Sequence, residues 1–173
     1  KNGFTALLAA VDKAGIASTL TAANADLTVL APTDAAFGAL ATQLGFTNAS
    51  AMVAALPAAD LGKILRYHVI PGARSSAALS TAGATLATAY VFDGAAARLA
   101  LNTSSGVAFT DAVLARASVT TPNVYADNGI IHGIDKVLIP PGVLNVVQMA
   151  QTNPASFSSL VGAVVATGLA PAL

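Results

Sequence analysis

Apolar positions recur at two different periods along the chain, and these periods divide it into a mainly helical half and a mainly β half. Across most of residues 4–68 they recur every three or four residues, as on one face of an α-helix. Across residues 84–140, short apolar or β-branched runs are separated by Gly, Asn and Asp, as in strands joined by turns. Helices and strands in separate halves predict an α+β fold, in which helices pack against a mixed or antiparallel sheet.

Capping residues mark the ends of the expected helices. Gly15 follows the last apolar turn of the first helix, where a left-handed C-cap is favoured. Thr33 is a suitable N-cap for the second helix, which we expect to stop at Gly45. The predicted helices are Phe4–Leu20, Asp34–Leu44, Asn48–Leu56 and Asp60–His68, the last with Leu61, Ile64, Leu65 and His68 on one face.

Strands are expected in most of the remaining chain. Pro71-Gly72 predicts a turn after one short strand. Asp127-Asn128, followed by Gly129, predicts a tight turn into a later strand. The predicted strands are Leu27–Ala31, Val69–Ile70, Ala84–Thr88, Ala97–Leu101, Val107–Thr110, Ala117–Thr120, Ile130–Ile134 and Lys136–Ile139.

An internal repeat relates the two ends of the chain. Phe4–Leu20 aligns without gaps on Phe157–Leu173, and seven of the 17 aligned positions are identical. Roughly two matches are expected by chance in a chain so rich in Ala and Leu. The second copy follows a short helical pattern at Val143–Thr152. We therefore expect one domain over residues 1–142 that lacks its first helix, and the opening helices of a second, truncated repeat over residues 143–173.

Composition excludes several classes of function. Of the 173 residues, 55% are hydrophobic and 9% charged, but every apolar stretch is interrupted before the roughly 20 residues that a transmembrane helix needs. Eight basic residues balance eight acidic ones and are scattered, so a nucleic-acid interface is not expected. Cys is absent, which excludes a disulfide framework and thiolate chemistry.

Three segments resemble conserved blocks of the fasciclin (FAS1) domain family, in the family's order. Thr28–Phe37 is similar to the first block, Tyr67–Gly72 to the Tyr-His motif, and Asn128–Pro140 to the second block. The resemblance covers almost all of residues 1–141. It implies a wedge-shaped mixed or antiparallel sheet packed with several helices, in which the two blocks supply central strands. It also implies a secreted or cell-surface protein that binds other proteins or matrix. Because the sequence contains no recognisable catalytic motif, we expect this protein to act without catalysis, and we expect no cofactor.

The resemblance also indicates candidate binding residues. In animal members of the family, an Asp-Ile pair just before the second block is linked to receptor binding, and the matching positions here are Asn123 and Val124. The carboxylate is lost, so this mode of receptor recognition is not carried over. Tyr67 and His68 match the family's Tyr-His motif, and Tyr125 is a candidate because aromatic side chains dominate interface hot spots.

Two interpretations are open for the two histidines, His68 and His132. His68 could act as a general base, with Ser75, Ser76 or Thr33 as the nucleophile. Alternatively it is a buried histidine bonded to the backbone or to a neighbouring hydroxyl group, which fits the apolar helical face that it shares. No nucleophile motif is present, so we favour the structural interpretation for both histidines, and a hydrolase is the weakest hypothesis.

Two functions remain in question. The first is an adhesion module that acts by surface complementarity, with extracellular partners or with other copies of itself through tandem repeats or swapping of the helices in residues 143–173. The alternative is a carrier of a small apolar ligand, such as a lipid or pigment, which needs a roomy cavity between helices and sheet. A metal site is not expected, because the eight Asp residues are spread singly along the chain.

Overall fold

Two parallel strands from distant parts of the chain lie side by side within the sheet. A computed structural model of the chain describes residues 3–22 and 25–152. In it, β1 (Leu27–Pro32) pairs in parallel with β7 (Gly129–Ile134). These strands belong to the two segments that resemble the family's conserved blocks, and each has a strand on its other side. The expectation that the two blocks supply central strands is confirmed.

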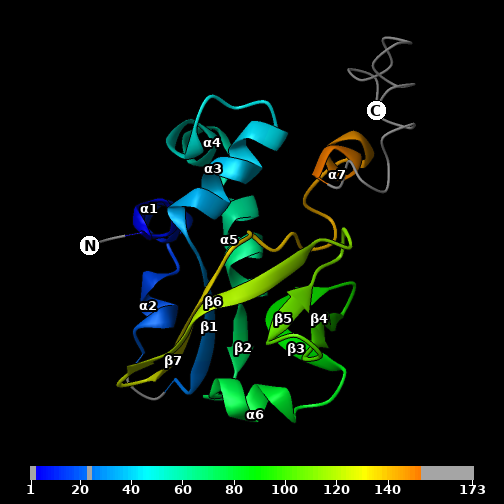
Figure 1. Cartoon of the computed structure of the whole chain (residues 1–173). Helices are drawn as coiled ribbons and strands as arrows, with labels where there is room; N and C mark the ends of the chain where they lie inside the picture. The colour runs from blue at the N-terminus through cyan, green and yellow to red at the C-terminus, as the bar shows by residue number, and fades with distance from the viewer. Residues whose placement is uncertain (1–2, 23–24, 153–173) are drawn as a thin grey trace.

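The described residues form a seven-stranded sheet in the order β2-β1-β7-β6-β5-β4-β3. Every neighbouring pair other than β1 and β7 is antiparallel. The two strands at the ends of this order, β2 and β3, contact each other, so the sheet curls round (Figure 1). A mixed sheet packed with helices confirms the predicted α+β fold. The remaining strands are β2 (Val69–Pro71), β3 (Thr85–Phe92), β4 (Ala95–Asn102), β5 (Ala108–Thr110) and β6 (Arg116–Ala126).

Helices lie at both ends of the sheet. Figure 1 shows α1, α3 and α4 gathered at one end of the molecule and α6 at the other. Gly15 ends α1 in the left-handed conformation (φ 67°), and the Thr33 hydroxyl accepts the Ala36 N–H at 3.2 Å, so both predicted caps are confirmed. Among the described helices, none is long and apolar enough to cross a membrane. They are α1 (Thr5–Ala14), α2 (Ala17–Leu20), α3 (Asp34–Gln43), α4 (Ala49–Ala55), α5 (Ala58–Tyr67), α6 (Ser76–Ser80) and α7 (Val146–Thr152).

The interior contains two apolar clusters. The helical cluster lies between the helices and includes Phe37 and Leu40 of α3 and Leu61 of α5. The sheet cluster lies inside the curled sheet and includes Leu30 of β1 and Phe109 of β5. Full burial of a side chain of this size contributes roughly 1.5–3 kcal/mol relative to exposure. The apolar residues that recur at helical spacing in the sequence thus form the helix faces that fill the helical cluster.

The segment Lys136–Ile139 is extended but is not a strand, so this part of the sequence prediction is wrong. Buried side chains, not a neighbouring strand, accept two of its N–H groups. The Leu138 N–H donates to His68 Nε2 at 2.9 Å, and the Ile139 N–H donates to Asp111 Oδ2 at 2.8 Å. Its alternating side chains enter both clusters, which produces the same sequence pattern as a strand.

The segment that follows residue 142 is described only in part. Helix α7 starts directly after Asn145, because the Gln148 N–H donates to Asn145 Oδ1 at 2.8 Å and the Asn145 N–H donates to Gln148 Oε1 at 3.1 Å. Met149 of α7 packs against the helical cluster. The repeat copy at Phe157–Leu173 lies outside the described residues, so the division of the chain after residue 142 stays a prediction.

Candidate binding surface

Two of the candidate binding residues, Tyr67 and His68, lie inside the domain. Tyr67 ends α5 and His68 follows it, and they are 1% and 2% exposed. The Tyr67 hydroxyl donates to the Arg98 carbonyl at 3.1 Å, and its ring packs edge-on against Tyr90 with 6.3 Å between the ring centroids. A partner on the folded surface does not reach these two side chains, which instead fix α5 against the sheet.

His68 joins α5 to the extended segment that follows β7. Its Nε2 accepts the Leu138 N–H at 2.9 Å, so Nδ1 carries the proton and donates to the Ile64 carbonyl at 2.7 Å. Burial lowers the pKa of His68 to about 4, so the ring is neutral near pH 7. The structural interpretation of His68 is confirmed, because both ring nitrogens are bonded to backbone groups.

The three hydroxyl groups considered as nucleophiles have other partners. Thr33 Oγ1 and Ser75 Oγ each accept a backbone N–H at the start of a helix. Ser76 Oγ accepts from Asn123 Nδ2 at 2.9 Å. Within the described part of the chain none of the three is hydrogen-bonded to His68. None of these three hydroxyl groups is therefore placed for activation by His68.

The second histidine supports an irregular part of β6. Around Pro122 the pairing of β6 with β7 is interrupted, and Asn123 adopts a left-handed backbone conformation (φ 60°). His132 Nδ1 accepts the Asn123 N–H at 3.2 Å, and its Nε2 donates to the Arg74 carbonyl at 2.9 Å. Asn123 Oδ1 in turn accepts the Ser76 N–H at 2.8 Å, which ties β6 to α6. The ring is 0% exposed, so the structural interpretation of His132 is confirmed as well.

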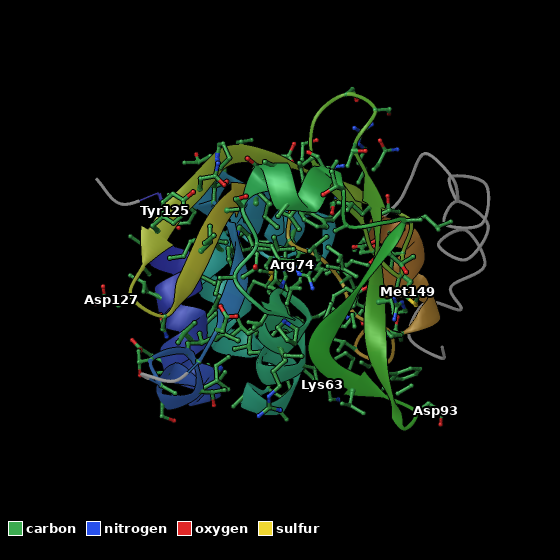
Figure 2. The ribbon with its side chains drawn as sticks, turned by 90° about the horizontal axis from the view of Figure 1, so that it is seen from below. Lys63, Arg74, Asp93, Tyr125, Asp127 and Met149 are labelled. Atoms are coloured by element: carbon green, nitrogen blue, oxygen red, sulfur yellow. The ribbon has the colours of Figure 1, made fainter. Side chains whose placement is uncertain are left out.

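Directly after this irregularity, two large apolar side chains lie on the surface. Tyr125 is 71% exposed and Val124 is 46% exposed. Both belong to the hairpin of β6 and β7, which closes through the predicted turn at Asp127-Asn128. Successive side chains of a strand point to opposite faces, so the two residues present apolar groups on both sides of the hairpin. Figure 2 shows Tyr125 at the outer edge of this part of the molecule.

Contacts with the rest of the domain hold the hairpin in place. Asn128 Nδ2 donates to the Leu20 carbonyl at 2.7 Å, and the Leu27 N–H donates to the Asn128 carbonyl at 3.2 Å. Gly129 lies so close to β1 that a Cβ atom there would be 2.1 Å from the Leu27 carbonyl oxygen. These contacts therefore fix the hairpin that carries three of the five candidate residues, which are neighbours in sequence. We refer to Asn123, Val124 and Tyr125 as the candidate surface, and its role in binding stays a prediction.

Sequence reasoning missed a buried carboxylate, Asp111, which follows β5 and is 5% exposed. Its Oδ1 accepts the N–H groups of Val113 and Ala115 at 3.0 and 2.8 Å, and its Oδ2 accepts the Ile139 N–H. Burial raises the pKa of Asp111 to about 6, although these hydrogen bonds and Lys136 act in the opposite direction. The described residues contain no group of three or more metal-ligating side chains, and Asp111 instead braces two loops. Its one sequence signal is its place directly after a predicted strand.

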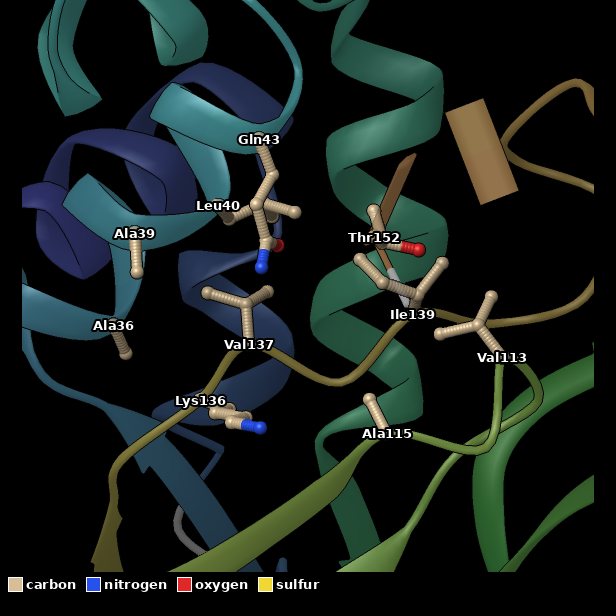
Figure 3. Close-up of a pocket in the computed structure, with 10 residues that line it drawn as sticks. All are labelled: Ala36, Ala39, Leu40, Gln43, Val113, Ala115, Lys136, Val137, Ile139 and Thr152. Atoms are coloured by element: carbon tan, nitrogen blue, oxygen red, sulfur yellow. The ribbon is translucent and has the colours of Figure 1, made fainter. Parts of the chain in front are cut away.

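Two cavities in the described part of the chain, which lie among the helices and the segments that pack on them, are small. Figure 3 shows the one beside Lys136 and Thr152, which has a volume of about 50 Å³. A second, among apolar side chains of α1, α3, α4 and α5, has about 10 Å³. A groove of about 270 Å³ between α1 and α4 is open to solvent. Ligand pockets usually have roughly 300–1,000 Å³, so neither cavity supports the carrier hypothesis.

Comparisons with known proteins agree with the motifs and the fold. The family model of the fasciclin domain matches residues 2–140. Protein sll1483 from Synechocystis is 34% identical over 144 residues, which cover 80% of this chain and 68% of the relative. Uncharacterized protein sll1735 from the same organism is 32% identical over 136 residues, which cover 79% of this chain and 89% of the relative.

A solved structure shares the fold. It is a FAS1 domain pair from the insect cell adhesion molecule Fasciclin I, with a TM-score of 0.59 and 18% sequence identity. The match covers 90% of this chain and 52% of that chain, so the present chain spans about half the length of the solved pair. At this identity the likeness shows a common fold and nothing about a common partner.

Proposed function

The chain belongs to the fasciclin domain family, and we propose that it is an extracellular or cell-surface binding module that mediates adhesion without catalysing a reaction. Its partners in this proposal are extracellular proteins, matrix or further copies of itself. Membership of a family that is often adhesion-related supports the general role. The insect protein that shares the fold is described as a cell adhesion molecule, which is consistent with the same role here.

The exposed side chain of Tyr125 is the observation that carries this proposal. A tyrosine offers a large apolar area and a hydroxyl group while losing few rotamers, which is why tyrosines dominate interface hot spots. The ladder with β7 and the contacts of Asn128 hold the strand that carries Tyr125. A surface whose backbone is already fixed before binding loses little conformational entropy when it binds a partner. The zero formal net charge favours apolar complementarity over long-range electrostatic attraction.

Beads coated with the chain test the proposal. We expect wild-type beads to cluster or to bind cells of the producing organism, and Tyr125→Ala to weaken this binding about tenfold or more, as for a hot-spot residue. Leu8→Ala is the matched control, because Leu8 is 63% exposed but lies on α1. The proposal fails if well-folded wild type binds nothing. It also fails if Tyr125→Ala and Leu8→Ala weaken binding equally.

A further inference from the structure

Leu114 lies exposed in a backbone conformation that leucine rarely adopts. It belongs to the loop between β5 and β6, is 67% exposed and has a φ of 62°. A bulky side chain is strained in this left-handed region, whereas Asp and Asn tolerate it. The two other described residues with a positive φ that are not glycine, Asp93 and Asn123, are of the tolerant types. Strained residues persist where their surroundings fix them, and they are frequent at binding sites.

The buried carboxylate of Asp111 fixes the loop that carries Leu114. Asp111 Oδ1 accepts the N–H groups of Val113 and Ala115 at 3.0 and 2.8 Å, so it binds the backbone on both sides of Leu114. The Leu114 N–H donates to the Asp111 carbonyl at 3.1 Å, and the Asp111 N–H donates to the Ala115 carbonyl at 3.1 Å. These four hydrogen bonds leave the loop little freedom to turn the leucine inward. The fold therefore presents an apolar side chain to solvent on a fixed support.

The described part of the chain ends close to this loop. Before α7, the backbone passes directly against β3, since a Cβ atom on Gly142 would lie 2.5 Å from the Phe92 ring. Helix α7 then packs against the helical cluster. Its last residue, Thr152, is 7% exposed and lines the same cavity of about 50 Å³ as Val113, the neighbour of Leu114 (Figure 3). The chain therefore leaves α7 beside the loop that carries Leu114.

The repeat copy that follows carries apolar residues at the positions that pack in the first copy. Phe157–Leu173 repeats the sequence of the segment that forms α1 and α2. In that first copy, Leu7 and Val11 pack against the helical cluster. The equivalent positions of the second copy are Leu160 and Val164, which are apolar as well. The second copy therefore also requires an apolar surface against which to bury these side chains.

We infer that the segment Phe157–Leu173 docks over Leu114 of the same chain, with the Leu114 side chain as its apolar anchor. Phe157 follows Thr152 by five positions, a span of at most roughly 18 Å, so the segment begins close to the loop. Contact with the segment removes the exposed leucine from water, which is favourable. This contact goes beyond the proposed adhesive function, because its partner belongs to the same chain.

Hydrogen exchange of the backbone amides, followed by nuclear magnetic resonance on the full chain, tests this inference. We expect the amides of Phe157–Leu173 to exchange about tenfold faster or more in Leu114→Asn than in wild type, because Asn removes the apolar anchor. Asn tolerates a positive φ, so the domain stays folded, and the amides of β1 and β7 report this. Leu8→Asn is the matched control, since Leu8 is 63% exposed but lies on α1, and it should leave these rates unchanged.

A spin label locates the segment independently. The sequence contains no Cys, so Ala112→Cys provides a single attachment point for a nitroxide and keeps Leu114 in place. Residue 112 is exposed and lies in the same loop. We expect this label to broaden the amide signals of Phe157–Leu173. A label on Ala9→Cys, which is exposed on α1, should leave the same signals sharp.

Faster exchange in Leu114→Asn, together with broadening from residue 112 alone, supports docking over Leu114. Unchanged exchange in this variant, equal broadening from both labels, or no broadening from residue 112 would overturn it. In a mixture, broadening of an unlabelled, isotope-enriched chain by a spin-labelled chain would place the segment on a second copy and would overturn docking within one chain. The bead experiment is separate: if the beads bind no cell, the adhesive function fails and the docking of the segment stands.

Discussion

His132 accepts the Asn123 N–H through Nδ1 at 3.2 Å, across the place where the pairing of β6 and β7 is interrupted. Pro122 has no N–H to donate there, and the turned backbone of Asn123 aims its own N–H at the ring. The other ring nitrogen holds the Arg74 carbonyl. One buried side chain therefore supports both the candidate surface and the segment that leads from β2 to α6.

Replacing His132 by Ala should lower the free energy of unfolding by about 2–4 kcal/mol. The substitution leaves a cavity and removes the partners of the Asn123 N–H and the Arg74 carbonyl. Urea unfolding at pH 7 measures the loss. Tyr125→Ala is the control and should change the free energy by no more than about 0.5 kcal/mol, because its side chain is exposed. Equal stability of His132→Ala and wild type would show that the ring is not a support.

Two substitutions of Asn123 should differ although both remove its side-chain bonds to Ser76. Ala is strained at φ 60° and Gly is not, so Asn123→Ala should be less stable than Asn123→Gly by about 1 kcal/mol. Parallel urea unfolding of the two variants gives the difference directly. If Asn123→Ala is as stable as Asn123→Gly, residue 123 does not keep the left-handed conformation in solution.

The parts of the fold that depend on neighbours in sequence were predictable. The Thr33 cap, the left-handed Gly15 and the buried face of α5 each follow from spacing over one or two helical turns. The short helix α6 was missed, because its five residues carry almost no periodicity, although Ser75 caps its start.

The features that depend on distant residues were not predictable. The sequence pattern of Lys136–Ile139 does not reveal that His68 and Asp111 replace a neighbouring strand as hydrogen-bond acceptors. The Tyr-His motif indicated binding residues, whereas the fold buries both side chains. The exposure of Tyr125 depends on the length of β6 and on its pairing with β7, and the sequence pattern reveals neither.

His68 should make the protein less stable in acid. Its pKa in the folded chain, about 4, lies below the reference value of 6.5, so the unfolded state binds more protons between these values. The stabilisation is present above pH 6.5 and is lost as the pH falls towards 4, by about 3 kcal/mol in total. His68→Gln does not titrate, and we expect the stability difference between wild type and this variant to shrink by that amount from pH 7 to 4. A difference that stays constant with pH would contradict the assignment.

Asp111, in contrast to His68, should contribute more to the stability of the protein in acid than at neutral pH. Its folded pKa of about 6 lies above the reference value of 3.8, so the folded state binds more protons between these values. Its contribution is fully present below pH 3.8 and is lost as the pH rises through 6, by about 3 kcal/mol. Asp111→Asn resembles the protonated acid, so the advantage of wild type over this variant should be largest in acid. If the stability advantage of wild type over Asp111→Asn instead increases above pH 6, the hydrogen bonds from the three N–H groups lower the pKa of Asp111 by more than burial raises it.

The approach of Gly129 to β1 leads to the largest expected loss of stability. A Cβ atom at Gly129 would lie 2.1 Å from the Leu27 carbonyl oxygen and 2.9 Å from its carbon, both backbone atoms within the parallel pair. Relief requires β1 and β7 to separate, so Gly129→Ala should cost roughly 3 kcal/mol or more. Gly38→Ala in α3 is the control: nothing lies within 4 Å of its Cβ position, and Ala should stabilise the helix by about 0.5–1 kcal/mol. Urea unfolding should therefore move the two midpoints in opposite directions, and a Gly129→Ala midpoint at or above that of wild type would show that β1 and β7 are not this close.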